Sequence, residues 1–167
     1  MAIVQKIVPN FWFNRNADEA VTHYVSIFKN SSIGDKTYYT DAGFEQHQML
    51  EGTTLTIEFK LEGSDFVALN AGPEFEFTEA ISFIVYCDSQ EEIDYYWENL
   101  SSGGDPRSQM CGWLKDRFGV SWQIVPSEFI KMLKDKDRTK VERAMAAMMQ
   151  MKKLDINKLR DVFNGKD

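Results

Sequence analysis

Few side chains in this 167-residue sequence combine a reactive type with a suggestive position. His47 lies in the polar segment FEQHQ ahead of a predicted strand, and an imidazole can transfer protons near neutral pH. Glu58 lies on the polar face of an alternating segment, which fits a carboxylate facing a cleft as well as one facing solvent. Cys111 has no histidine near it in sequence, so its pattern favours packing over a nucleophilic role. Glu58 and His47 are therefore the leads for acid–base catalysis.

The elements that would position these side chains occur twice. The segment FWFNRNADEAVTHYVSIF, from Phe11, aligns without a gap on FIVYCDSQEEIDYYWENL, from Phe83, at an offset of 72 residues. Each copy is an alternating apolar segment followed by helical spacing, which predicts a strand and then an amphipathic helix. Identities are few, so a duplication and a shared supersecondary pattern both fit. Two like modules would create a cleft, where small molecules bind.

The first copy predicts a strand, a helix opened by Asn16 and three further strands, over residues 3–13, 17–28, 33–40, 54–61 and 65–70. The second copy predicts a strand over 81–87, a helix opened by a capping box of Ser89 and Glu92, and short strands around 110–116 and 120–125. Helices are predicted over 128–133, 139–151 and 155–163. The sequence thus predicts one α+β domain, made of modules at 1–73 and 79–126 with a helical tail over 127–167.

Composition excludes several classes of function. The net charge of −7 argues against binding nucleic acid, because phosphates need a basic surface. No segment approaches the length of a membrane span, and the N-terminus lacks an apolar signal core. Cys87 and Cys111 make no disulfide framework, so a cytoplasmic location is expected. Five of the eight methionines lie from Met132 to Met151, and this bias favours core or interface packing over a soft-metal or peptide site.

A long run in the second module resembles a known family. The run CGWLKDRFGVSWQIVP, from Cys111 to Pro126, is rich in rare residue types. Together with Phe11-Trp12-Phe13 and the tail AMAAMMQMKKLDINKL, it resembles the PhnB-like branch of the vicinal oxygen chelate superfamily, often labelled 3-demethylubiquinone-9 3-methyltransferase-like. The resemblance covers essentially the whole chain. It implies the glyoxalase/bleomycin-resistance fold, two tandem βαβββ modules, here with C-terminal helices, and a homodimer.

The resemblance also implies where a divalent metal would bind. Its ligand positions fall at Asn10 (or Pro9), Asn70, Ser82 and Gln123, and none of these is a histidine or a carboxylate. Neutral amides and hydroxyls hold a divalent ion weakly, so no cofactor is expected, although weak metal binding stays open. The methyltransferase label gains no support, since Gly103-Gly104 follows a predicted helix and not a buried strand, as an adenosylmethionine-binding turn would.

Strand alternation and the implied positions together predict the lining of the cleft: Asn10, Trp12, Asn70, Ser82, Ile84, Tyr86, Trp113, Ser121 and Gln123. An aromatic wall with several hydrogen-bonding groups suits a flat small molecule with polar edges. The sequence therefore predicts a small-molecule binding protein. The alternative is an enzyme, such as an isomerase or lyase, acting on a small polar metabolite in the same cleft. A structural protein with a filled cleft is a third possibility.

Overall fold

The computed structural model describes residues 5–166, and the chain forms two compact units with the boundary between Glu76 and Phe77. The sequence placed this boundary between residues 73 and 79. The C-terminal helices belong to unit 2.

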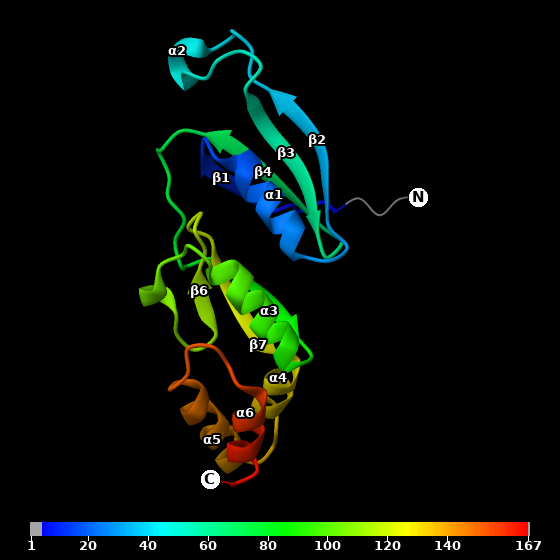
Figure 1. Ribbon diagram of the computed structural model, residues 1–167, viewed down its shortest axis with the longest axis vertical. Coiled ribbons are helices and arrows are strands. Elements are labelled where there is room, and N and C mark those ends of the chain that lie inside the picture. The colour runs from blue at the N-terminus through cyan, green and yellow to red at the C-terminus, as the bar shows by residue number, and fades with distance from the viewer. Residues whose placement is uncertain (1–4, 167) are drawn as a thin grey trace. The chain divides into compact units, whose positions relative to one another are not determined.

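Unit 1 contains one helix packed on a four-stranded sheet (Figure 1). Its elements are β1 (Asn10–Asn14), α1 (Ala17–Ile27), β2 (Ser32–Tyr38), the short α2 (Phe44–His47), β3 (Thr54–Leu61) and β4 (Ser64–Ala71). The strand order is β1-β4-β3-β2, with β1 parallel to β4 and the other pairs antiparallel. The predicted succession of strand, helix and three strands is therefore confirmed, with α2 as an addition.

The first strand begins later than the sequence predicts. It starts at Asn10, and residues 5–9 form no strand, while the predicted residues 3 and 4 lie outside the described part. Pro9 cannot donate a backbone hydrogen bond, although its carbonyl oxygen accepts one from Val67 N at 3.0 Å. Pro9 therefore marks the point where regular pairing begins.

The core of unit 1 lies between α1 and one face of the sheet. Phe11, Phe13 and Phe59 are buried there against Val21 and Tyr24 of the helix. Residues of the opposite parity lie on the other face, which we call the open face of the unit 1 sheet. Strand alternation thus decides which side chains form the core and which are left for binding.

Unit 2 repeats this topology with one strand fewer. It comprises β5 (Phe83–Cys87), α3 (Gln90–Ser101), a single 3₁₀ turn η1 (Pro106–Ser108), β6 (Trp113–Lys115) and β7 (Ser121–Pro126). The strand order is β5-β7-β6, and β5 is parallel to β7, as β1 is to β4. In the place of β2, residues 102–112 form a loop with η1 and an isolated bridge between Met110 and Trp113. The two-unit α+β fold is confirmed, but the second unit lacks one strand of the expected βαβββ pattern.

Three C-terminal helices complete unit 2, namely α4 (Ser127–Leu133), α5 (Arg138–Met148) and α6 (Ile156–Phe163). They share an apolar cluster with the end of β7, made of Val125, Phe129, Met132, Ala144, Met151, Leu154 and Leu159. Met132 and Met151 are buried in this cluster, whereas Met145 and Met149 are exposed. Within residues 5–166, no helix has the length and apolar character needed to cross a bilayer.

Candidate functional site

The candidate site is the face of the unit 2 sheet opposite α3. Strand register places Gln123 of β7 between Ile84 of β5 and Trp113 of β6, and places Ser121 beside Lys115. Side chains of the other parity, such as Leu114 and Ile124, are buried beneath the helix. We call the side away from α3 the open face of unit 2. Its residues are Ser82, Ile84, Tyr86, Trp113, Lys115, Ser121 and Gln123, together with Val125, which is buried in the cluster of the C-terminal helices.

Six of the nine residues predicted to line a ligand site therefore share this face. Ile84 and Tyr86 are 46% and 58% exposed, so a large part of the face is accessible apolar and aromatic surface. Gln123 Nε2 donates a hydrogen bond of 2.8 Å to Ser82 Oγ. This bond joins β7 to the residue before β5 and orients the amide and the hydroxyl next to Ile84.

Ser121 has the least satisfied polar atom on the face. The residue is only 2% exposed, and its Oγ has no hydrogen-bond partner among residues 5–166. A buried hydroxyl without a partner costs about 1–3 kcal/mol.

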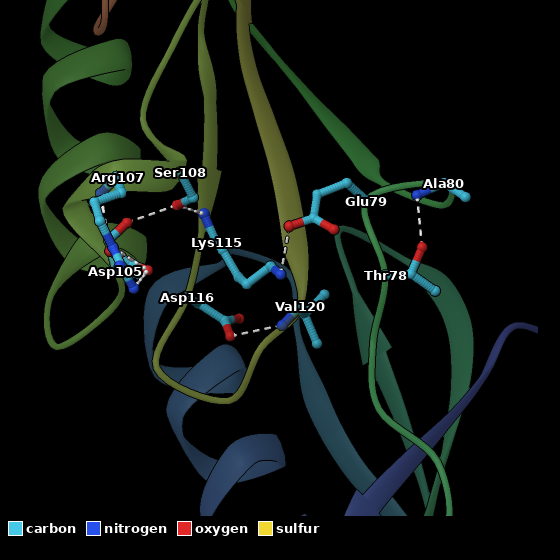
Figure 2. Close-up of polar contacts among 9 residues, drawn as sticks. All are labelled: Thr78, Glu79, Ala80, Asp105, Arg107, Ser108, Lys115, Asp116 and Val120. Atoms are coloured by element: carbon cyan, nitrogen blue, oxygen red, sulfur yellow. Dashed lines mark hydrogen bonds and ion pairs between the residues drawn. The ribbon is translucent and has the colours of Figure 1, made fainter.

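Lys115 is a charged member of the face that the sequence reasoning missed. Its Nζ lies 2.5 Å from Glu79 Oε1 (Figure 2). The pKa of Glu79 is held below its ordinary value, chiefly by the hydrogen bond from Lys115. The signal was present in the sequence, because Lys115 follows Trp113 by two residues on a short strand and must share its face.

The backbone around Lys115 is fixed by close packing. Lys115 N donates to Ser108 Oγ at 2.9 Å. A Cβ on Gly104 would overlap the carbonyl oxygen of Lys115, so only glycine fits there, and Gly103 has a φ of +76°. The Gly103-Gly104 pair therefore lets the loop after α3 approach β6 closely.

Asp116 organises the turn that joins β6 to β7. Its carboxylate is buried and accepts hydrogen bonds from Phe118 N at 2.8 Å, Val120 N at 3.0 Å and Trp122 Nε1 at 2.8 Å. The bond to Val120 is drawn in Figure 2. These contacts explain the spacing of aspartate, glycine and tryptophan in the CGWLKDRFGVSWQIVP run, and they fix the start of β7 where Ser121 lies.

The remaining three predicted lining residues belong to unit 1. Asn10 and Trp12 lie on the open face of its sheet, where Trp12 Nε1 donates to the Gly72 carbonyl oxygen at 2.9 Å. Phe75 packs edge-on against the Trp12 ring, with the centroids 4.8 Å apart. The indole is thus held by its own unit, while Asn10 is exposed.

Asn70 lies on the helix-covered face of the sheet and not with Asn10 and Trp12. Only 4% exposed, it accepts a hydrogen bond from Ala17 N at 3.3 Å through Oδ1 and donates one of 3.1 Å to the Thr54 carbonyl oxygen. Asn16, the expected cap of α1, makes no side-chain capping bond. Asn70 is therefore the cap, and a ligand contact there would require breaking these bonds.

The two leads for acid–base catalysis differ in their surroundings. Glu58 is exposed on the open face of unit 1 and lines a cavity of about 290 Å³. Its lining comprises Gln5, Val8, Ser32, Gly34, Glu58, Phe59, Lys60, Asp65, Phe66 and Val67. His47 is engaged within its own loop, where Nδ1 accepts from Met49 N at 3.0 Å and Nε2 lies 3.2 Å from the Ala42 carbonyl oxygen. Glu58 thus lines this cavity, and His47 is not among its lining residues.

The groups at the implied metal positions do not fit a tightly held divalent ion. Asn70 is occupied as a helix cap, and Gln123 and Ser82 bond to each other. All of these groups are neutral, so they cannot balance the charge of the ion. Nowhere in residues 5–166 do three histidine, cysteine, aspartate or glutamate side chains gather as a metal site would require.

Residues 5–125 match the family model described as 3-demethylubiquinone-9 3-methyltransferase. The solved structure of the PhnB protein from Bacillus cereus is 33% identical, with a TM-score of 0.62 over 74% of this chain and 100% of that one. Protein PA1353 from Pseudomonas aeruginosa is 20% identical, with a TM-score of 0.55 over 74% and 98% of the two chains. The fosfomycin resistance protein FosX from Listeria monocytogenes is 14% identical, with a TM-score of 0.52 over 80% and 99%. No curated protein matches the chain.

These similarities establish the class. The chain belongs to the family described as 3-demethylubiquinone-9 3-methyltransferase, the PhnB-like branch of the vicinal oxygen chelate superfamily. Its two units have the glyoxalase/bleomycin-resistance fold that the sequence predicted, and the C-terminal helices follow the residues that the family model matches.

Proposed function

We propose that this protein binds a small organic molecule on the open face of unit 2 without a tightly bound metal. The observation that carries the proposal is the buried Ser121 hydroxyl, which has no partner among residues 5–166 and shares its face with Lys115 and Gln123. A buried hydroxyl with an unmet hydrogen bond calls for an explanation, and a ligand that reaches it when the side chains over Ser121 move would supply one.

The chemistry around Ser121 suits a flat molecule with polar edges. Trp113, Tyr86 and Ile84 offer aromatic and apolar contact, whereas Gln123 and Ser82 offer hydrogen bonds. Binding sites for small molecules combine these two kinds of surface.

The methyltransferase in the family's description is not part of the proposal. Gly103-Gly104 follows α3 and packs against Lys115, so it does not form a glycine-rich turn between a buried strand and a helix. The parallel pairs, β1 with β4 and β5 with β7, join the first and last strands of a unit and are not consecutive strands with a helix between them. Neither feature supports an adenosylmethionine site.

Benzamide, a neutral aromatic amide, is a direct probe of the proposed site. In an amide NMR titration of the full chain, we expect shifts centred on Ser82, Ile84 and Gln123. The variant Gln123→Leu should weaken the shifts several-fold, because it removes the amide that bonds to Ser82. Gln150→Leu, the same change at an exposed position of the tail, is the control. Shifts that fall elsewhere, or none at all, would contradict the proposal.

The metal part of the proposal has its own test. Metal analysis of the purified protein should give far less than one divalent ion per chain, and EDTA should leave both the melting temperature and the benzamide shifts unchanged. Stoichiometric metal whose removal lowers either quantity would refute it.

An enzyme is the second candidate, and the position of Glu58 on the unit 1 cavity favours it. A carboxylate there could move a proton to or from a small polar metabolite. Deuterium exchange into pyruvate in D₂O, followed by proton NMR, would detect such a reaction. Catalysed exchange that Glu58→Gln abolishes and His47→Gln leaves intact would favour the enzyme over the binding protein.

Association into a homodimer stays a prediction of this proposal. Light scattering on the eluting protein should report about twice the chain mass of 19.3 kDa.

A further inference from the structure

We propose that the ligand is a small carboxylic acid, that Lys115 binds its carboxylate, and that Glu79 occupies Lys115 in the ligand-free protein. The inference rests on the proposed function, since it names the class of molecule that the open face of unit 2 takes. It gives Lys115 of that face a role and adds Glu79 to the site.

The two partners of the ion pair differ in how firmly they are held. Lys115 lies on β6, its backbone nitrogen is bonded to Ser108 Oγ, and its side chain is 25% exposed. Glu79 lies outside any helix or strand, in a bent segment where Ala80 N donates to Thr78 Oγ1 at 3.0 Å (Figure 2). Ile81 N also donates to the Thr78 carbonyl oxygen, at 3.4 Å. Its side chain is 63% exposed. Glu79 can therefore swing into water at little cost, while Lys115 stays in place.

Glu79 fills only part of the site it occupies. Its carboxylate binds Lys115, but the hydroxyl of Ser121, the cross-strand neighbour of Lys115, still has no partner within residues 5–166. A free carboxylic acid is not tethered to the chain at residue 79. It can place one oxygen on Lys115 and the other near Ser121, and so satisfy a bond that Glu79 leaves open.

The same geometry predicts how the rest of the acid would bind. From Ser121, the next residue of β7 on this face is Gln123, which lies between Ile84 and Trp113. An aromatic or unsaturated body would contact this row while its carboxylate lies at Lys115. The structure thus assigns the charged end of the molecule to the β6–β7 turn.

Benzoate and benzamide form a matched pair of probes, because they differ in charge and hardly in shape. Benzoate should bind wild-type protein and Glu79→Gln, with the dissociation constant about two- to fivefold lower in the variant, since a competing exposed ion pair is removed. Lys115→Met should bind benzoate several-fold more weakly than wild type. In the double variant, Glu79→Gln should bring no further gain. Affinities come from calorimetry or from NMR titration.

The control variant is Glu76→Gln, which neutralises an exposed carboxylate three residues before Glu79 and should leave benzoate affinity unchanged. A ligand-independent check is the pKa of Glu79, followed by carboxyl carbon NMR. The pKa of Glu79 should lie below the ordinary value of a glutamate in wild type and rise in Lys115→Met.

The outcomes separate this inference from the proposed function. Benzamide shifts on the face with equal benzoate affinity in wild type, Glu79→Gln and Lys115→Met would refute the role of Lys115 and leave the binding site standing. If benzoate bound to none of the variants while benzamide still bound, the carboxylic-acid inference would be refuted and the binding site would stand. A probe that shifts no residue of the face, whether neutral or charged, would refute both.

Discussion

At the scale of single residues, Asp116 shows how one buried carboxylate can define a site that it does not enter. It accepts bonds from two backbone nitrogens and one indole nitrogen, and it thereby fixes the turn between Lys115 and Ser121. Hydrogen bonds to a charged acceptor are strong, and buried donors are costly to leave unpaired. Asp116 therefore stabilises the turn and thereby positions Lys115 and Ser121.

The variant Asp116→Ala should lower the free energy of unfolding by about 3 kcal/mol, because three donors lose a charged acceptor. Urea denaturation followed by tryptophan fluorescence measures the change. Asp41→Ala, at an exposed position, should stay within about 0.5 kcal/mol of wild type. Equal stability of the two variants would show that the turn does not depend on Asp116.

Cys87 has a thiol whose ionisation should be visible in stability. Burial, with Glu92 and Asp88 adding to it, raises the pKa of the thiol from 9.0 to about 12. Above pH 9 the unfolded chain therefore releases a proton that the folded chain keeps, so stability is lost as the pH rises from about 9 towards 12. Over this range the free energy of unfolding should fall by at most about 1.4 kcal/mol per pH unit.

The comparison with Cys87→Ala isolates this effect, since lysines and tyrosines titrate equally in both proteins. Urea denaturation at pH 8, 9, 10 and 11 should show wild type losing stability faster than the variant. Parallel curves would mean that the thiol ionises alike in the folded and unfolded chains.

At the scale of elements, helix α1 obtains its cap from a distant strand. Asn70 of β4, 53 residues along the chain from Ala17, accepts the bond from Ala17 N, while the neighbouring Asn16 makes none through its side chain. Propensity correctly marked the start of the helix, but it could not identify the capping side chain. Sheet register decides that, because it brings β4 alongside β1.

Replacing Asn70 and Asn16 by alanine, one at a time, shows which of them caps α1. Asn70→Ala should cost about 2 kcal/mol of stability, because it frees Ala17 N and the carbonyl oxygen of Thr54 in a buried place. Asn16→Ala should cost less than about 0.5 kcal/mol. Thermal and urea unfolding both measure the difference. A larger loss of stability in Asn16→Ala than in Asn70→Ala would show that Asn16 caps the helix.

At the scale of the whole molecule, the C-terminal tail is part of unit 2 and not an appendage. Gln90 of α3 binds the tail twice, donating to the Leu154 carbonyl oxygen at 3.2 Å and accepting from Ile156 N at 2.9 Å. On the other side, Cys111 N donates to the Met151 carbonyl oxygen at 2.7 Å. The methionine-rich segment therefore serves mainly as core packing, with Met145 and Met149 at the surface.

Leu159→Ala in α6 should lower stability by about 3 kcal/mol, because the side chain is 1% exposed within the tail cluster. In hydrogen exchange, faster exchange should extend to amides of α3 and β7. The control is Leu50→Ala, at a side chain that is 72% exposed. Faster exchange confined to α4, α5 and α6 would show that the tail folds independently.

Much of this architecture could be predicted from sequence, because strands and helices follow local alternation. The strand from Thr54 to Leu61 has the predicted boundaries, and α1 differs from its prediction by one residue. In unit 2 the residue pattern predicted two strands after the helix, as the structure has, whereas the resemblance implied a third strand that residues 102–112 do not form. Residues 102–112 contain Gly103-Gly104 and Pro106, whose backbone preferences oppose a regular strand.

The sequence by itself determined the family, the order of the elements and the parity that places Ser82, Ile84 and Gln123 on one face, since these depend on neighbours along the chain. Only the tertiary structure decided that Lys115 meets Glu79, that Ser121 Oγ is buried with no hydrogen-bond partner in the described part of the chain, and that Asn70 bonds to the start of α1. These contacts join residues far apart in sequence. These contacts depend on strand register and loop packing, which a local sequence pattern does not determine.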